Sequence, residues 1–475
     1  MDLIKSTKKC NIIAIPYPGR GHINPLMNFC KQLISTAQPN NNIQITVVVT
    51  EEWQELLSPD PVPETMRFVA IPNVLPLEGS RGKSFQAFVE AILTKMEPAV
   101  DSLLDRLEIP DPSIILSDAY LRWALKIGRR RNIPVAPFWT VSATMYSIFH
   151  HFDLLLQNGH FQAIPTGAEW GEKVVDYIPG LAPICLADFP PQIHGAGPEI
   201  LAVTLDVIKS IPVEAKCLLF TSYYELESSA IDALKAKFPI PIYTIGPAIP
   251  YWTLKEDNSS SDVVDYSGWL NSQPKSSVLY ISFGTYISVS SLQIDEIAAG
   301  IVDSGVRFFW VIREDVSRWE MGKDNRGLIV PWCDQIKVLC HPSIGGFWSH
   351  CGWNSTKEGA FSGVPMLTFP LKWDQYPNSK HIVEDWKMGQ RLKKSDGSFV
   401  SREEISGVLR KFMDLDWDEG KEMRRRAQEV KEICRRAIAE GGSSQLQIEA
   451  FFTEIHGFSP QNQLAMRGVD HLLLY

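Results

Sequence analysis

Short apolar runs, many of them β-branched, alternate with longer stretches of helical periodicity along the first half of the chain. The apolar runs are Ile12–Ile15, Ile43–Val49, Phe68–Ile71, Ile114–Leu116, Val135–Phe138 and Leu218–Phe220. Runs without polar alternation are typical of strands that are buried on both faces of a parallel sheet. Helical patterns lie between several of them, for example at Pro25–Ser35 and Phe85–Leu107. This order predicts a doubly wound α/β domain.

The pattern stops at 251–265, where KEDNSSSDVVD has few core residues and predicts a linker or a long exposed loop. It then restarts, with strands predicted at Val278–Phe283, Phe308–Ile312, Leu328–Val330, Gly346–Trp348 and Met366–Phe369. Charged helices are predicted over 402–440. We therefore expect fold class α/β, with two Rossmann-like halves at 1–245 and 246–455 and a tail at 456–475. Ligands should bind in a cleft between the halves, beyond the carboxyl ends of the strands.

Composition fits a globular chain of two or three domains. The 475 residues are 45% hydrophobic and 21% charged, which are ordinary proportions for a folded protein. Their 46 basic and 55 acidic residues give a formal net charge of −9. Nucleic acid is therefore not expected as the main partner, because phosphate binding needs a basic face.

Targeting signals and disulfides are not expected either. The apolar run at 11–16 is too short for a signal peptide, and no run approaches the roughly 18 residues needed to span a bilayer. The eight cysteines show no C-x-x-C pair, which favours reduced thiols. These features predict a cytoplasmic protein with no integral membrane segment.

The window 332–375 contains the most informative chemistry. Trp332 follows a predicted strand and could stack on a base, or lie in the core. Next, a glycine turn beside His350 leads to Asn354 and Ser355, whose side chains suit a helix N-cap and whose backbone N–H groups suit an anion. A diphosphate would be held there without a metal.

The same window continues with groups that suit sugar hydroxyls. Glu358, one helical turn on, could accept from ribose hydroxyls or be an ordinary surface residue. Asp374 and Gln375 follow another strand, and an acceptor beside a donor–acceptor pair suits vicinal hydroxyls. Each feature is weak alone, whereas their order and spacing together are specific.

This window resembles the signature box of plant secondary-metabolite UDP-glycosyltransferases of glycosyltransferase family 1, which adopt the GT-B fold. The matching motifs are W-C-x-Q, H-C-G-W-N-S-x-x-E and W-D-Q. The resemblance implies that the second half binds UDP-glucose as co-substrate, without a metal or other cofactor. It also implies that the first half binds a small-molecule acceptor.

Roles carry over from the family motif by position. Trp332 matches the uracil-stacking residue, and Gln335 and Glu358 match the ribose ligands. The diphosphate ligands match His350, Trp353, Asn354 and Ser355, and a phosphate loop matches 282–285, including Ser282 and Thr285. The contacts to the donor sugar match Trp373, Asp374 and Gln375, and glutamine at this last position usually accompanies glucose. Lys357 departs from the family, in which a small or apolar residue is common at this position.

A second motif predicts the catalytic base. In G-H-x-N-P, glycines permit a tight turn before His22, while Asn24 and Pro25 suit a helix start. This motif resembles the catalytic-histidine motif of the family, and Asp118, at the end of another strand, matches the aspartate that orients the histidine. Taken alone, His22 could be structural and Asp118 a helix cap.

We therefore predict an inverting enzyme, active as a monomer, that transfers glucose to a hydroxyl of a small apolar acceptor such as a phenolic, flavonoid or terpenoid. Another UDP-sugar donor, or a non-catalytic UDP-sugar-binding protein, stays open. A dinucleotide oxidoreductase is disfavoured because Asn24 occupies the last glycine position of G-x-G-x-x-G. Acceptor contacts are predicted, with core packing as an equal alternative, at Trp139, Met145, Phe149, Phe189 and Tyr376.

Overall fold

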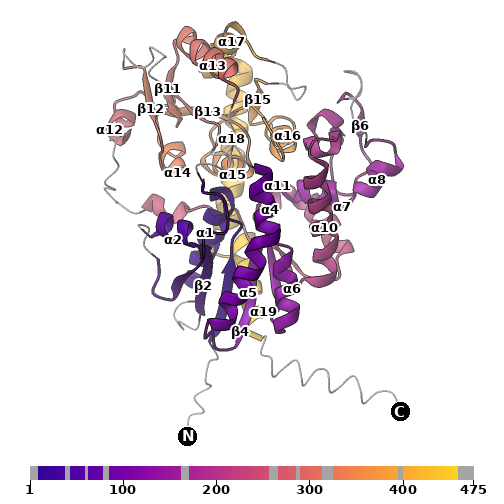
Figure 1. Cartoon of the computed structure of the whole chain (residues 1–475). Coiled ribbons are helices and arrows are strands. Elements are labelled where there is room, and N and C mark those ends of the chain that lie inside the picture. The colour runs from indigo at the N-terminus through magenta and orange to yellow at the C-terminus, as the bar shows by residue number, and fades with distance from the viewer. Residues whose placement is uncertain are drawn as a thin grey trace, which may run out of the picture.

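The computed structural model describes residues 9–37, 43–58, 62–78, 85–161, 171–255, 266–284, 289–312, 325–393 and 399–457. These residues form two α/β units, and in Figure 1 the unit with the second sheet lies above the unit with the first. The architecture therefore has the two Rossmann-like halves that the sequence predicts.

The first unit is built on a seven-stranded sheet of order β3-β2-β1-β4-β5-β8-β9, in which all neighbours are parallel. Its strands are β1 Cys10–Ile15, β2 Ile43–Thr50, β3 Met66–Ile71, β4 Pro112–Asp118, β5 Val135–Trp139, β8 Leu218–Phe220 and β9 Ile242–Thr244. Ile13 lies in the core on one face and Ile12 in the core on the other. Burial on both faces explains the unbroken apolar runs.

Helices connect these strands and cover both faces of the sheet (Figure 1). They are α1 Arg20–Ala37, α2 Glu51–Leu57, α4 Phe85–Ala91, α5 Glu97–Arg106, α6 Trp123–Arg131, α7 Ala143–His150, α8 Phe152–Gln157, α10 Pro198–Glu214 and α11 Tyr224–Lys237. The helix predicted over Phe85–Leu107 is found, with a π-helical turn η1 at Ile92–Met96 in its middle. Smaller elements are the antiparallel pair β6 Val174–Val175 and β7 Ile184–Cys185, and the 3-10 turns η2 Leu186–Asp188 and η3 Pro191–His194.

The second unit has a six-stranded parallel sheet of order β12-β11-β10-β13-β14-β15. Its strands are β10 Val278–Ser282, β11 Arg307–Val311, β12 Gly327–Val330, β13 Ile344–Ser349, β14 Met366–Thr368 and β15 Gly389–Arg391. Its helices are η4 Tyr251–Lys255, α12 Tyr266–Asn271, α13 Ser291–Ser304, α14 Gln335–Leu339, α15 Trp353–Ser362, α16 Gln375–Lys380, η5 His381–Asp385, α17 Arg402–Met413 and α18 Asp418–Ile438. Every strand predicted in both halves is therefore confirmed. The predicted linker lies mostly at 256–265, outside the described residues.

The last described helix, α19 Ser443–Gly457, packs against the first unit, although the predicted second domain extended to residue 455. Ile448 and Phe451 belong to the core on one face of the first sheet, and the Phe451 ring lies 6.0 Å from that of Phe29. Figure 1 shows α18 descending toward the first unit and α19 beside its strands. Helices α18 and α19 thus tie the two units together.

Two helix starts differ from the prediction. Helix α1 begins at Arg20, not at Asn24, because the Gly19 carbonyl accepts from the backbone N–H groups of His22 and Ile23 at 2.9 and 2.8 Å. This places His22 in the first turn. Helix α15 has Gly352 as its N-cap rather than Asn354 or Ser355. Because the backbone of Gly352 is already extended, the helix starts at Trp353.

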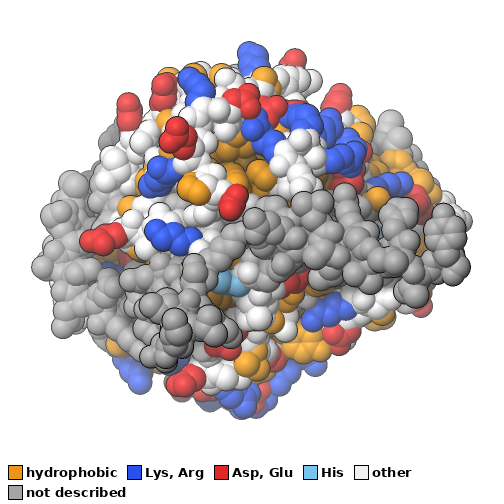
Figure 2. All heavy atoms as spheres, turned by 90° about the horizontal axis from the view of Figure 1, so that it is seen from below, with side chains coloured by type: hydrophobic (Ala, Val, Ile, Leu, Met, Phe, Trp, Pro, Cys, Tyr) orange, Lys and Arg blue, Asp and Glu red, His pale blue; other side chains and the backbone are white. Residues whose placement is uncertain are grey.

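The molecular surface carries both signs of charge. On the described part of the face in Figure 2, basic and acidic side chains are interspersed rather than gathered by sign. None of the described helices is long and apolar enough to cross a membrane.

Candidate active site

His22 and Asp118 form a direct pair at the carboxyl edge of the first sheet. His22 Nδ1 lies 2.8 Å from Asp118 Oδ2, and the second carboxylate oxygen accepts from the Tyr120 backbone N–H at 3.0 Å. Asp118 is buried, whereas the His22 side chain is 27% exposed. With Nδ1 donating to the carboxylate, the other ring nitrogen of His22 would carry the lone pair that a general base needs.

Three neighbours of His22 were not identified from the sequence. The Thr140 hydroxyl lies 3.0 Å from Nδ1, and the rings of Tyr17 and Tyr120 lie 4.8 and 6.0 Å from the imidazole. Thr140 directly follows β5, so its position beyond a strand end was the only available signal. The imidazole of His22 is therefore flanked by two aromatic rings and has a second polar contact besides Asp118.

The predicted phosphate side lies in the second unit, around His350. A Cβ atom on Gly284 would lie 2.7 Å from His350 Nε2, and one on Gly352 would lie 2.6 Å from it. Only glycine at both positions leaves the imidazole its place beside the start of α15. Burial lowers the pKa of His350 to about 4, against a backbone hydrogen bond with Ser282 that raises it. His350 is therefore neutral at pH 7 and offers an N–H donor rather than a charge.

The predicted ribose ligands are brought together. Gln335 donates through Nε2 to Ser355 Oγ at 3.0 Å and to the Glu358 carboxylate. The Tyr280 hydroxyl donates to Gln335 Oε1 at 2.9 Å. Burial raises the pKa of Glu358 to about 7, although the Gln335 hydrogen bond lowers it. Trp332, directly before this cluster, is 56% exposed and so is not a core residue.

Asp374 and Gln375, the predicted sugar ligands, stand at the start of α16 and are buried. Gln375 Oε1 accepts from the backbone N–H groups of Leu371 and Lys372 at 2.8 and 2.9 Å. This arrangement occupies the oxygen and leaves the amide N–H groups as donors. Burial raises the pKa of Asp374 to about 6, and Asn378, which donates to it at 2.8 Å, lowers it.

Residues of the signature box also bridge the two units. Asn354 Nδ2 donates to the Gly21 carbonyl at 2.8 Å, and the indole of Trp353 donates to the Thr221 carbonyl at 2.8 Å. The Trp353 indole is therefore engaged in an interdomain contact, and the role of Trp353 at the diphosphate stays a prediction. Trp373 reaches the first unit as well, with its ring 5.5 Å from that of Phe85.

Lys357 is buried in α15, and its ammonium nitrogen has no hydrogen-bond partner within the described part of the chain. Burial lowers its pKa to about 7, against the attraction of the Glu358, Glu227 and Asp374 carboxylates. In the residue that departs from the family motif, burial thus makes the charged form of the side chain unfavourable.

The predicted acceptor residues are all buried. Trp139, Met145, Phe149 and Phe189 belong to the core of the first unit, and Tyr376 donates to the Leu371 carbonyl at 3.3 Å. Trp139 stacks on Tyr120, with ring centroids 5.2 Å apart, and so supports one of the two aromatic rings beside His22. Thr285 lies outside the described residues.

Comparison with known proteins identifies the family. UDP-glycosyltransferase 87A2 of Arabidopsis thaliana is 47% identical over 94% of this chain and 96% of its own length. UDP-glycosyltransferase 87A1 of the same plant is 46% identical over 93% of this chain and 99% of its own length. A family model described as UDP-glucoronosyl and UDP-glucosyl transferase matches residues 236–413. The chain belongs to this UDP-glycosyltransferase family.

Solved structures of plant UDP-glycosyltransferases are similar over nearly the whole chain. Medicago truncatula UGT71G1, solved with UDP-glucose, has a TM-score of 0.79 and 27% identity, covering 95% of this chain and 99% of its own. Phytolacca americana UGT2, solved with UDP-2fluoro-glucose and pterostilbene, has a TM-score of 0.76 and 26% identity, covering 96% and 100%. This protein is therefore a GT-B glycosyltransferase of the plant family 1 type.

Proposed function

We propose that this UDP-glycosyltransferase transfers glucose from UDP-glucose to a hydroxyl of a small apolar acceptor and inverts the anomeric carbon, giving a β-glucoside. The observation that carries the proposal is the His22–Asp118 pair, 2.8 Å apart in the first unit. Across the domain junction, the charge that His22 can carry lowers the pKa of Asp374, a predicted sugar ligand of the second unit. This proximity supports a reaction space shared by the proposed base and the predicted sugar-binding carboxylate.

The proposed chemistry is a single displacement. An acceptor hydroxyl is a poor nucleophile at neutral pH, so the second ring nitrogen of His22 takes its proton as the oxygen bonds to the anomeric carbon. UDP departs from the opposite face with the bonding electron pair. Asp118 fixes the tautomer and stabilises the imidazolium, as the carboxylate of a hydrolase triad does.

Glucose is the proposed sugar because of Gln375 and the donors found in related structures. The amide N–H groups of Gln375 and the Asp374 carboxylate supply one donor and one acceptor for adjacent hydroxyls. Medicago UGT71G1 is solved with UDP-glucose.

An apolar, flat acceptor is proposed because aromatic rings surround the base. Tyr17 and Tyr120 flank His22, and Phe88 lies against Tyr17 with ring centroids 5.8 Å apart. Rings of this kind favour stacking and edge contacts with aromatic ligands. The complex of Phytolacca UGT2 with pterostilbene supports this class of acceptor.

We propose metal-independent catalysis, with the start of α15 and His350 holding the diphosphate. Within the described residues, no group of three or more His, Cys, Asp or Glu side chains is arranged to hold a metal ion. A monomer in the cytoplasm stays a prediction.

Mass spectrometry with a panel of hydroxylated aromatic and terpenoid acceptors tests the proposal. Each acceptor is incubated with UDP-glucose, UDP-galactose, UDP-xylose or UDP-glucuronate, and the product linkage is assigned by NMR. We expect β-linked hexosides from UDP-glucose. Products formed only from another donor, or α-linked products, would contradict it.

A further inference from the structure

Glu227 lies inside the domain junction, and the sequence predicts no role for it. This α11 residue is buried, and its carboxylate accepts from the backbone N–H groups of Ala143 and Thr144 at 3.0 and 2.9 Å. The Ser222 hydroxyl donates to it at 2.6 Å. Three such bonds satisfy a buried carboxylate and fix its place.

One side of this carboxylate is connected to the base. Ala143 and Thr144 open helix α7, which follows the segment that carries Thr140. The Thr140 hydroxyl lies 3.0 Å from His22 Nδ1, and the Trp139 indole donates to the Ser142 carbonyl at 2.9 Å. By holding the first turn of α7, Glu227 therefore holds the short segment that contacts the base.

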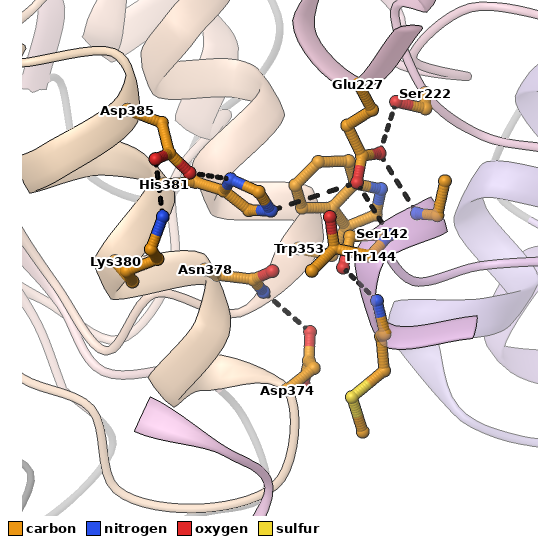
Figure 3. Close-up of polar contacts among 12 residues, drawn as sticks. Ser142, Thr144, Ser222, Glu227, Trp353, Asp374, Asn378, Lys380, His381 and Asp385 are labelled. Atoms are coloured by element: carbon orange, nitrogen blue, oxygen red, sulfur yellow. Dashed lines mark hydrogen bonds and ion pairs between the residues drawn. The ribbon is translucent and has the colours of Figure 1, made fainter. Parts of the chain in front are cut away.

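The other side faces the helix that carries the sugar ligands. His381 Nε2 lies 3.9 Å from Glu227 Oε1 across the junction, as Figure 3 shows. His381 Nδ1 lies 2.7 Å from Asp385 Oδ2, so the carboxylate of Asp385 orients the ring. His381 directly follows α16, whose first residue is Gln375 and whose cap is Asp374. A shift of His381 is therefore transmitted along one short helix to both sugar ligands.

We propose that Glu227 is a positioning residue for glycosyl transfer, which aligns the base of the first domain with the donor sugar of the second. One carboxylate holds the start of α7 beside the base and faces His381 at the end of α16. The inference rests on the proposed roles of His22, Asp374 and Gln375. Misplacement of reacting groups by about 1 Å can cost roughly 100-fold in rate.

The proposal predicts a division between turnover and UDP binding. Within the described structure, Glu227 forms no hydrogen bond or ion pair with the predicted uridine ligands Trp332, Gln335 and Glu358, which lie in the second domain. Glu227→Gln should therefore lower kcat about 10- to 100-fold and leave the Kd of UDP close to that of the wild type. A merely structural defect would reduce folding and UDP affinity together with kcat.

A double-mutant cycle with His381→Gln supplies the test. If both residues act through their mutual contact, Glu227→Gln/His381→Gln should be no slower than the slower single variant. Asp232→Asn is the matched control, because this carboxylate also belongs to α11 but accepts from the Tyr224 hydroxyl at 2.9 Å and does not contact His381. It should retain wild-type kcat. We would measure kcat, the KM of UDP-glucose, the Kd of UDP by calorimetry and Tm for every variant.

Wild-type kcat in Glu227→Gln, additive losses in the cycle, or parallel losses of kcat and UDP affinity would each overturn the proposal. If Glu227→Gln does not fold, His381→Gln decides, and wild-type kcat in that variant overturns it. His22→Ala is assayed in parallel. Unchanged turnover there would remove the proposed base, whereas a non-additive Glu227–His381 cycle would still establish the positioning contact.

Discussion

Asn354 of the second domain donates through Nδ2 to the carbonyl of Gly21 in the first domain, at 2.8 Å. In an α-helix this carbonyl would accept from the backbone N–H four residues on, but that residue is Pro25, which has no N–H. The proline thus keeps an acceptor available for a side chain of the other domain. Since Gly21 precedes His22, the bond ties the donor helix α15 to the segment of the proposed base.

Pro25→Ala tests this relationship, because the new backbone N–H would compete with Asn354 for the Gly21 carbonyl. We expect Tm to stay constant or rise, since an interior helical proline is costly. The kcat/KM for UDP-glucose should fall about three- to tenfold, the equivalent of one net hydrogen bond. Pro212→Ala in α10 is the control, because it also replaces an interior helical proline. Equal effects of both substitutions on kcat/KM would contradict the interdomain explanation.

Donor selectivity is the second prediction. Gln375→Glu keeps an oxygen for the Leu371 and Lys372 N–H groups but removes the amide donors proposed to bind sugar hydroxyls. It should cost about 1–3 kcal/mol in kcat/KM for UDP-glucose, with the Kd of UDP little changed. The wild type should prefer UDP-glucose over UDP-galactose by kcat/KM. An equal or reversed preference in steady-state assays would refute the assignment.

The sequence predicted what depends on local patterns. Unbroken apolar runs identified parallel strands as short as Leu218–Phe220, whereas Ile242–Thr244 and Gly389–Arg391 contain polar residues and lack such a run. The signature box located Gln335, Ser355 and Glu358, which the fold brings together. The order of these residues along the chain was sufficient to predict that they lie together.

Contacts made only by tertiary packing were not predictable in this way. Thr140 and Glu227 lie in no motif, and their importance follows from neighbours 118 and 84 residues away in the chain. The start of α1 was misplaced because Pro25 resembles a first-turn proline, although Gly19 already closes the turn. Likewise, nothing local to Trp353 indicates the contact of its indole with Thr221.

Lys357 gives a prediction about stability and pH. Its pKa in the folded protein is lowered from 10.5 to about 7, with burial as the main cause. The unfolded chain therefore binds more protons between about pH 7 and pH 10.5. Stability from this group is present above pH 10.5 and is lost as pH falls toward 7.

Lys357→Met should accordingly raise Tm most at pH 7 and below, and its advantage over the wild type should shrink as pH rises toward 10. Thermal unfolding of both proteins at pH 6, 8 and 10 measures the difference. Lys337→Met is a control, since Lys337 is only partly buried and lies beside Asp334 on α14. A Tm difference between Lys357→Met and the wild type that grows with pH would contradict the prediction.

Metal independence is a further prediction. The diphosphate charge is assigned to the start of α15 and the N–H of His350, neither of which requires a cation. Glucosyl transfer should therefore continue unchanged after dialysis against EDTA. Loss of activity that Mg²⁺ or Mn²⁺ restores would show that the phosphate site has been misinterpreted.

The base assignment makes the strongest demand on the proposed mechanism. His22→Ala removes the only imidazole paired with Asp118 in the described structure, so kcat should fall about 10²- to 10⁴-fold, the usual contribution of a positioned general base. Asp118→Asn should also be slow, because it no longer favours the correct tautomer or the imidazolium. UDP binding should be nearly unchanged in both variants, since the predicted uridine ligands belong to the other domain. The two losses should be smaller for an acidic phenol than for an aliphatic alcohol, because an acidic hydroxyl needs less help to lose its proton. Stopped assays with such a pair of acceptors measure this difference, and near-normal turnover of the alcohol by His22→Ala would eliminate His22 as the base.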